Sequence, residues 1–221
     1  MIRWEQLDTA PIPGGGELRL KRRGTELSIM TGAIELMNSR LSGSEKALAS
    51  LSCAAIAERP APRILIGGLG MGFTLRAAQA LLAPDAAIAV AELVPAVIAW
   101  AKGPLAPLHG NSLADPRVTI HQADVAALIR AAAYDAILLD VDNGPRGLSR
   151  PGNDGLYSPA GLAAAKQALR PGGVLAIWSA VQDTAFTRRL RDAGFAVEEV
   201  TARAHRPGKG ARHVVWAATR L

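Results

Sequence analysis

The stretch that decides the fold is RILIGGLGMGFTLRAA, residues 63–78. It begins as a short apolar run, continues through several closely spaced glycines and ends as an alanine-rich segment with helical character. Glycines between a strand and a helix allow a ligand to approach the backbone at the helix N-terminus. The stretch therefore predicts a strand, a tight turn and a helix, with a ligand site over the glycines.

The spacing of these glycines distinguishes two kinds of nucleotide site. A dinucleotide site uses the pattern G-x-G-x-x-G, which places a pyrophosphate on the helix N-terminus. Here Gly68, Gly70 and Gly72 follow the pattern G-x-G-x-G, and position 73 is Phe73. This spacing resembles the first motif of the S-adenosylmethionine-dependent transferases. A tight turn without any ligand would have the same glycines.

Beyond this stretch, strands alternate with helices to the end of the chain. Strands are expected at residues 64–66, 86–93, 117–120, 134–140, 174–179, 195–203 and 213–219. Helices are expected to begin after Gly72 and at Pro95, and a further helix is expected over residues 125–132. Two more are expected from Ser158 to about residue 169 and from Asp183 to Gly194. The sequence RPGG is expected to turn the chain after the first of these two. Alternating strands and helices predict a doubly wound α/β fold with a mainly parallel seven-stranded sheet and a closing antiparallel pair.

The first 60 residues have a different pattern. Residues 11–30 contain turn residues and two short alternating runs, which predict a β-hairpin. A helix is expected to open near Ser44, and Pro60 and Pro62 close the section. We therefore divide the chain into residues 1–60, a hairpin and helix that form a small lid, and residues 61–221, the α/β domain.

Composition excludes several classes of protein. The chain has 221 residues, of which 49% are hydrophobic, enough for a sizeable core. Cys53 is the single cysteine, so an intrachain disulfide and a cysteine-rich metal site are excluded, and no metal site is predicted. We interpret Cys53 as a buried apolar residue. No apolar run is long enough to span a bilayer, which predicts a cytoplasmic protein without membrane association.

The net charge of +6 raises the question of a nucleic-acid partner. The basic residues gather at residues 19–24 and 203–213, and no aromatic residue lies among them to stack on bases. We interpret both segments as solvated turns. The expected partner is a small-molecule acceptor, and a homodimer is kept as an open expectation.

Acidic residues follow the next three strands of the series. Glu92 ends the second strand, Asp124 follows the third, and Asp140 and Asp142 follow the fourth. In doubly wound sheets, ligands bind beyond the carboxyl ends of the strands. A carboxylate at the position of Glu92 suits two ribose hydroxyls, and Asp124 could accept from an adenine amino group. Each acidic residue alone could be a helix cap, but together with the glycines they predict a nucleoside site.

These motifs resemble the spermidine synthase branch of the S-adenosylmethionine-dependent transferases. ILIGGLGMGFTLRAA is similar to the family's IIGGGDGGTLRE, and YDAILLDVDNGP to its YDVIISDSTDPIGP. The resemblance implies the Rossmann-like fold of class I methyltransferases. It also implies that Glu92 binds ribose, Asp124 and Val125 contact adenine, Pro145 closes the adenine side, and Asp140 is the aspartate that deprotonates the attacking amine.

The chain departs from the family on the acceptor side. Met71 stands where the family has the aspartate that grips the free amine of the substrate. Gly43 and Ser44 replace the tyrosine and histidine that precede the position of Glu45, and Glu35 or its neighbour replaces a glutamine. The nucleoside half of the site is therefore expected to be kept and the polyamine half to be lost.

The exchange at Met71 guides the choice of reaction. An aspartate there would repel the carboxylate of S-adenosylmethionine, so a thioether favours this cofactor over its decarboxylated form. We predict methyl transfer to a small amine or hydroxyl, with Asp140 as catalytic residue and with the acceptor held by Asp142, Asn143, Met71 and Ser44. The alternatives are an aminopropyltransferase that uses decarboxylated S-adenosylmethionine, a nucleoside-binding protein without catalysis, and an RNA-modifying methyltransferase.

Overall fold

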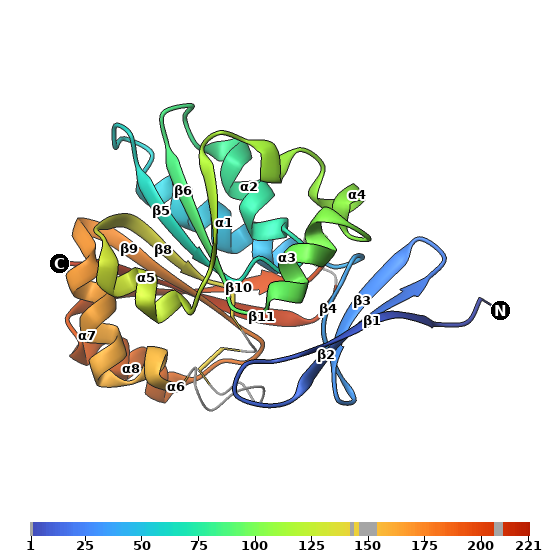
Figure 1. Ribbon diagram of the computed structural model, residues 1–221. Coiled ribbons are helices and arrows are strands. Elements are labelled where there is room, and N and C mark those ends of the chain that lie inside the picture. Colours follow the sequence, from blue (N-terminus) through green and yellow to red (C-terminus); the bar gives the residue numbers. More distant parts are fainter. Residues whose placement is uncertain (1, 142–143, 146–153, 206–209) are drawn as a thin grey trace.

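The computed structural model describes residues 2–141, 144–145, 154–205 and 210–221 and consists of an α/β body with an N-terminal sheet beside it (Figure 1). The strands of the body are β5 (Arg63–Gly67), β6 (Ala87–Glu92), β7 (Val118–Gln122), β8 (Tyr134–Leu139), β9 (Leu169–Ser179), β10 (Phe195–Arg203) and β11 (Arg212–Arg220). They form a seven-stranded sheet in the order β10-β11-β9-β8-β5-β6-β7. Among the described strands of this sheet, β11 alone runs in the direction opposite to the others. The predicted doubly wound fold is confirmed.

Helices cover both faces of this sheet (Figure 1). They are α1 (Gly43–Ala55), α2 (Phe73–Leu81), α3 (Pro95–Lys102), α4 (Ala106–His109), α5 (Val125–Ala131), α6 (Asp154–Tyr157), α7 (Pro159–Ala168) and α8 (Thr184–Asp192). Successive residues of β5 enter different cores, because side chains alternate along a strand. Ile64 and Ile66 pack in a cluster with residues of α1, α2 and α3, whereas Leu65 packs with residues of α5, α7 and α8. None of the described helices combines the length and the apolar character needed to cross a membrane.

The two helix starts predicted from caps are confirmed. The Ser158 hydroxyl accepts from the backbone N–H of Gly161 at 3.1 Å. The Asp183 carboxylate accepts from the N–H groups of Ala185 and Phe186 at 2.9 and 3.1 Å. These bonds satisfy donors that a helix N-terminus leaves without an intrahelical partner.

The hairpin predicted within residues 11–30 is confirmed, but it is part of a larger sheet than expected. This region forms a four-stranded antiparallel sheet in chain order, built from β1 (Glu5–Pro11), β2 (Glu17–Arg23), β3 (Glu26–Thr31) and β4 (Ile34–Asn38). The outer strand β1 is exposed over most of its length, and β4 is short with Asn38 as its one fully buried residue, so their sequences lack the alternation that reveals β2 and β3.

Two boundaries also differ from the prediction. The predicted division at residue 60 groups helix α1 with the N-terminal sheet. In the structure α1 packs against α2 and β9, so its contacts place it on the α/β body. The predicted turn at RPGG lies inside β9, which pairs with β8 at Leu169 and again at Val174 with a register shift between them. Gly172, with a φ of +69°, allows this irregularity within the strand.

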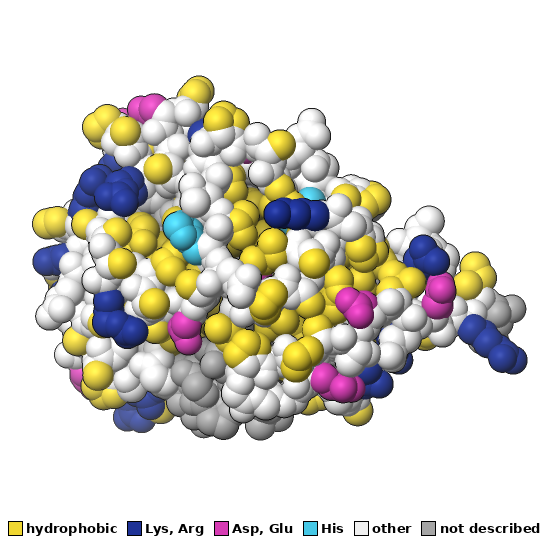
Figure 2. All heavy atoms as spheres, in the orientation of Figure 1, with side chains coloured by type: hydrophobic (Ala, Val, Ile, Leu, Met, Phe, Trp, Pro, Cys, Tyr) yellow, Lys and Arg dark blue, Asp and Glu magenta, His cyan; other side chains and the backbone are white. Residues whose placement is uncertain are grey.

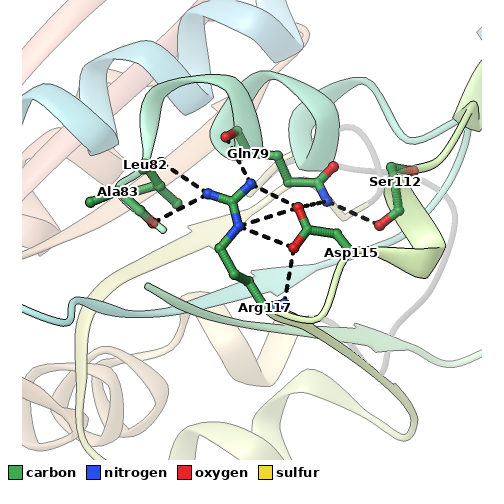
Figure 3. A network of polar contacts seen from close by, with 6 residues as sticks. All are labelled: Gln79, Leu82, Ala83, Ser112, Asp115 and Arg117. Atoms are coloured by element: carbon green, nitrogen blue, oxygen red, sulfur yellow. Dashed lines mark hydrogen bonds and ion pairs between the residues drawn. The ribbon is translucent and has the colours of Figure 1, made fainter. Parts of the chain in front are cut away.

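A polar network joins the end of α2 to the start of β7 (Figure 3). The guanidinium of Arg117 donates to the carboxylate of Asp115 at 2.7 Å and to the carbonyl groups of Leu82 at 2.9 Å and Gln79 at 3.1 Å. The last carbonyl groups of a helix have no partner within the helix, and Arg117 supplies one. The network therefore fixes α2, and with it the glycine turn that precedes this helix.

Replacing this guanidinium should lower stability in a pH-dependent way. We expect Arg117→Gln to lower the melting temperature, because the carbonyl groups at the end of α2 lose their donor. The hydrogen bonds from Arg117 lower the pKa of Asp115 from 3.8 to about 2. A pKa below that of the unfolded chain stabilises the fold above about pH 4, and this contribution is lost as the pH falls toward about 2.

Thermal unfolding between pH 7 and pH 2 measures this effect. The difference between the wild-type chain and Arg117→Gln should be constant down to about pH 4 and then shrink. Arg130→Gln, on the exposed side of α5, is the matched control and should leave the melting temperature unchanged. Equal melting temperatures for Arg117→Gln and Arg130→Gln would contradict the role of the network.

Candidate active site

The glycine turn between β5 and α2 is shaped by two close approaches. A Cβ atom on Gly68, where φ is +89°, would lie 2.5 Å from the carbonyl oxygen of Asp140. A Cβ atom on Gly70 would lie 2.8 Å from the Sδ and Cε atoms of Met37, which belongs to β4. Glycine is required at Gly68 because a side chain there would meet backbone atoms, and at Gly70 the φ of +47° favours glycine. The turn is thus enclosed by the end of β8 on one side and by the N-terminal sheet on the other.

A first pocket lies at the carboxyl ends of β5, β6 and β7 and is roofed by the N-terminal sheet. It contains about 870 Å³ of empty space, with the open solvent at its mouth included. Its lining includes five residues predicted to bind the cofactor, namely Gly68, Gly70, Glu92, Asp124 and Val125. Apolar side chains of the N-terminal sheet complete it, among them Ile12, Leu18, Ile29 and Leu36. In the view of Figure 2, hydrophobic side chains gather where this sheet meets the body.

Glu92 is the best-fixed polar group of the first pocket. Its side chain is 7% exposed, and its two oxygens accept from the N–H groups of Leu69 at 3.0 Å and Val94 at 2.8 Å. Burial raises the pKa of Glu92, and the backbone donors act in the opposite direction. A carboxylate has about four acceptor sites, so Glu92 can still accept from two hydroxyls while these bonds hold it in place.

Asp124 has a structural contact in addition to its place in the pocket. Its Oδ1 atom accepts from the N–H of Ala126 at 2.8 Å and caps α5. The cap fixes the carboxylate at the edge of the first pocket. The predicted contact with an adenine amino group stays a prediction, and the geometry is compatible with it.

A second pocket lies on the other side of Met37 and is acidic. It is lined by Glu35, Leu36, Met37, Asn38, Leu41, Glu45, Gly68, Leu69, Gly70, Met71, Gly72, Phe73, Asp140, Trp178, Ala180 and His213. Three of these side chains are carboxylates, from β4, α1 and the end of β8. The two pockets share Asp140, Met37 and the glycine turn. A molecule that extends from one pocket into the other must therefore pass Asp140.

Asp140 has the properties of a base at this junction. The Thr74 hydroxyl donates to its Oδ2 atom at 2.6 Å and fixes the carboxyl group. Burial of the carboxyl group, followed by the like charge of Glu45, raises the pKa of Asp140 to about 7. A pKa near the working pH allows a group to accept and release a proton in one cycle.

The remaining predicted residues are distributed as follows. Met71 is 1% exposed and packs in the core. Together with Gly72 it also lines the second pocket. Its predicted place beside the tail of the cofactor stays a prediction. Ser44 is buried and reaches the second pocket through its bonds to Glu45 and His213. Pro145, although among the described residues, lines neither pocket. Asp142 and Asn143 lie outside the described residues.

Several pocket residues were not predicted. Met37 reaches the glycine turn from β4, a strand that the sequence pattern missed. Trp178 and His213 lie on β9 and β11 and line the second pocket. Both are close to strand ends at the edge of the sheet where the ligand was expected. A search for aromatic and histidine side chains near these ends could have identified them.

Comparison with known proteins agrees with this geometry. No protein-family model matches the chain. A curated relative, the polyamine aminopropyltransferase of Mycobacterium tuberculosis, is 35% identical in an alignment of 141 residues that covers 58% of this chain and 26% of the relative. The chain thus spans about a quarter of the length of the curated relative it matches.

Two solved structures have the same fold over nearly the whole chain. Spermidine synthase from Thermotoga maritima has a TM-score of 0.75 and 18% identity, covering 98% of this chain and 73% of that one. A spermidine synthase in complex with the transition state analogue AdoDATO also has a TM-score of 0.75 and 18% identity, covering 96% of this chain and 73% of that one. The resemblance of this chain to the polyamine synthase branch of the S-adenosylmethionine-dependent transferases is therefore confirmed, and its fold is that of the spermidine synthases.

Proposed function

We propose that this protein is an aminopropyltransferase that uses decarboxylated S-adenosylmethionine and a small amine acceptor. The observation that carries the proposal is the position of Asp140, a carboxyl group with a raised pKa that lines both a pocket suited to a nucleoside and an acidic pocket. The name of the curated relative, a polyamine aminopropyltransferase, supports the same activity.

The comparisons do not support the expectation of methyl transfer, and the charge of the second pocket explains why. That expectation considered the single exchange at Met71, which removes one carboxylate. The second pocket contains three others, on Glu35, Glu45 and Asp140. Glu35 and the negative charge that Glu45 and Asp140 share attract a cationic chain and repel the carboxylate of ordinary S-adenosylmethionine. The pocket therefore favours the decarboxylated cofactor even with a thioether at position 71.

Each residue has a distinct task in the proposed reaction. Glu92 and the glycine turn would hold the nucleoside, and the acidic second pocket would hold the amine groups. The cofactor supplies a carbon that is activated by a neighbouring sulfonium. Asp140 would take a proton from the acceptor ammonium, so that the nitrogen lone pair becomes available at the junction of the pockets. The remaining task of the protein is alignment.

Calorimetry with three ligands tests the proposal. We expect decarboxylated S-adenosylmethionine to bind about tenfold more tightly than S-adenosylmethionine, since a like-charge contact in a partly desolvated pocket costs on the order of 1 kcal/mol or more. Methylthioadenosine, which lacks the charged tail, is the reference ligand. With a diamine added, the chain should release methylthioadenosine. A preference for ordinary S-adenosylmethionine would restore methyl transfer, and binding without turnover would indicate a nucleoside-binding protein.

A further inference from the structure

The start of helix α1 is fixed at the edge of the second pocket. The N–H of Gly43 donates to the carbonyl oxygen of Ala204 at 3.0 Å. A Cβ atom on Gly43 would overlap the carbonyl oxygens of Arg203 and His205, so glycine allows this close approach. The first turn of the helix is therefore tied to the end of β10, and the two residues that follow the glycine carry polar side chains.

These two residues, Ser44 and Glu45, belong to a row of hydrogen bonds that begins at His213. The Ser44 hydroxyl donates to Oε2 of Glu45 at 2.8 Å, and Nδ1 of His213 lies 2.8 Å from the same hydroxyl oxygen. A serine hydroxyl has one hydrogen, so Nδ1 of His213 must be the donor to Ser44. Ser44 is 1% exposed, and bulk water does not compete for these bonds. Both bonds therefore point toward the carboxylate of Glu45.

The ring of His213 is a fixed donor. It packs edge-on against Trp178, with ring centroids 4.8 Å apart, and both residues line the second pocket. Burial lowers the pKa of His213 and favours the neutral ring. A neutral ring with its hydrogen on Nδ1 and a protonated ring both donate from this atom, so the direction of the bond to Ser44 is the same in either form.

Glu45 differs from the buried carboxylate of Asp135 in its partners. Asp135 forms ion pairs with Arg59 at 2.7 Å and Arg170 at 2.9 Å. Among the residues that the structure describes, Glu45 takes part in no ion pair, and no lysine or arginine lines the second pocket. Lys46 acts on Glu45 through its charge, but Lys46 is exposed and lies outside this lining. A partly exposed carboxylate that is held by a neutral donor suits a cationic group of a ligand.

We propose that Glu45 binds an ammonium group of the acceptor, and that Ser44 and His213 are positioning residues that hold its carboxylate toward the second pocket. This proposal rests on the proposed function, which places amine groups in this pocket, and it names the carboxylate that holds the acceptor. Neutral donors orient Glu45 without neutralising it, so its charge stays available to the ligand. A cationic residue in place of Ser44 would hold the carboxylate equally well but would cancel that charge.

Calorimetric titration of 1,4-diaminobutane in the presence of methylthioadenosine tests the proposal. We expect Glu45→Gln and Ser44→Ala each to raise the Kd of the diamine about tenfold, the scale for weakening a contact with a charged group. The double variant should bind the diamine no more weakly than Glu45→Gln alone, because Ser44 acts only through Glu45. The Kd of methylthioadenosine should stay unchanged throughout. Ser50→Ala, at an exposed position of the same helix, is the matched control.

Two variants of His213 separate its hydrogen bond from its packing. His213→Asn places an amide N–H near the position of Nδ1, and we expect it to bind the diamine nearly as well as the wild-type chain does. His213→Leu keeps an apolar bulk without a donor, and its Kd should rise about as much as that of Ser44→Ala. In turnover with decarboxylated S-adenosylmethionine, the loss should appear in KM for the diamine while kcat stays unchanged.

The outcomes separate this proposal from the proposed function. A wild-type chain that binds the diamine but releases no methylthioadenosine would contradict the proposed function and leave the amine site supported. Turnover of the diamine together with wild-type affinity in Glu45→Gln would overturn the amine site alone. Additive losses in the double variant, or equal losses in His213→Asn and His213→Leu, would overturn the positioning roles. Ser44→Ala changes little volume, so the double-variant comparison decides even where His213→Leu does not fold.

Discussion

Asp140→Asn should lower kcat by about 10²–10⁴-fold, the usual contribution of a general base. The amide has nearly the same shape and can still bond to Thr74, which now donates to the Asp140 carboxylate at 2.6 Å. The loss would therefore report the missing proton acceptor and not a change in packing. Binding of methylthioadenosine, measured by calorimetry, should change little, because the nucleoside is expected to be held mainly by Glu92 and the glycine turn.

The pH dependence gives the same prediction a second readout. Since the raised pKa of Asp140 is about 7, kcat/KM of the wild-type chain should rise as the pH increases through that value. Glu45→Gln removes the like charge that contributes to the shift, so the rise should move to lower pH. Asp192→Asn, on the exposed last turn of α8, is the matched control and should keep the wild-type profile. Wild-type turnover in Asp140→Asn would exclude this residue as the base.

Glu92→Ala should weaken methylthioadenosine binding by about 1–3 kcal/mol, the scale of a lost hydrogen bond to a charged group. This corresponds to an about 5–150-fold higher Kd. The variant would lose the acceptor for the ribose and would also release the N–H groups of Leu69 and Val94, which now bond to the carboxylate. The glycine turn would no longer be tied to the end of β6.

Two further variants separate these contributions. Glu92→Gln keeps one carbonyl oxygen but presents an amide nitrogen to the second backbone donor, so we expect an intermediate affinity. Glu58→Ala, which removes an exposed carboxylate after α1, should bind as the wild-type chain does. Unchanged affinity in Glu92→Ala, or tighter binding of NAD than of methylthioadenosine, would contradict the nucleoside site.

The nucleoside half of the site could be predicted from sequence because it depends on local patterns. Glycines after β5 and acidic residues after β6 and β7 each follow a recognisable strand, and parallel strands bring their carboxyl ends to one edge of a sheet. Gly68, Glu92 and Asp124 therefore line one pocket, as the pattern indicates. The strand β8 was recognisable because its sequence is mostly apolar, and all of its residues are buried.

The acceptor half could not be predicted because its contacts connect distant parts of the chain. His213 and Ser44 are 169 positions apart, and neither residue belongs to a motif that indicates the other. Met37 enters the site from β4, a short strand whose sequence lacks periodicity, which hides its contact with Gly70. The argument from Met71 used one position of a pocket whose charge is set by three carboxylates. Charge in a pocket is a sum over all its walls, and a single aligned position does not determine it.

The core shared by the N-terminal sheet and the α/β body determines how the protein unfolds. Leu20 and Ile29 of the sheet are buried in the same cluster as Ile64 and Leu75 of the body. Moving the sheet away from the body would expose this cluster to water, at a free-energy cost of about 25 cal/mol per Å² of apolar surface. The shared core therefore ties the sheet to the body and opposes a hinged opening of the sheet. Heat should melt both parts together, as a single calorimetric peak.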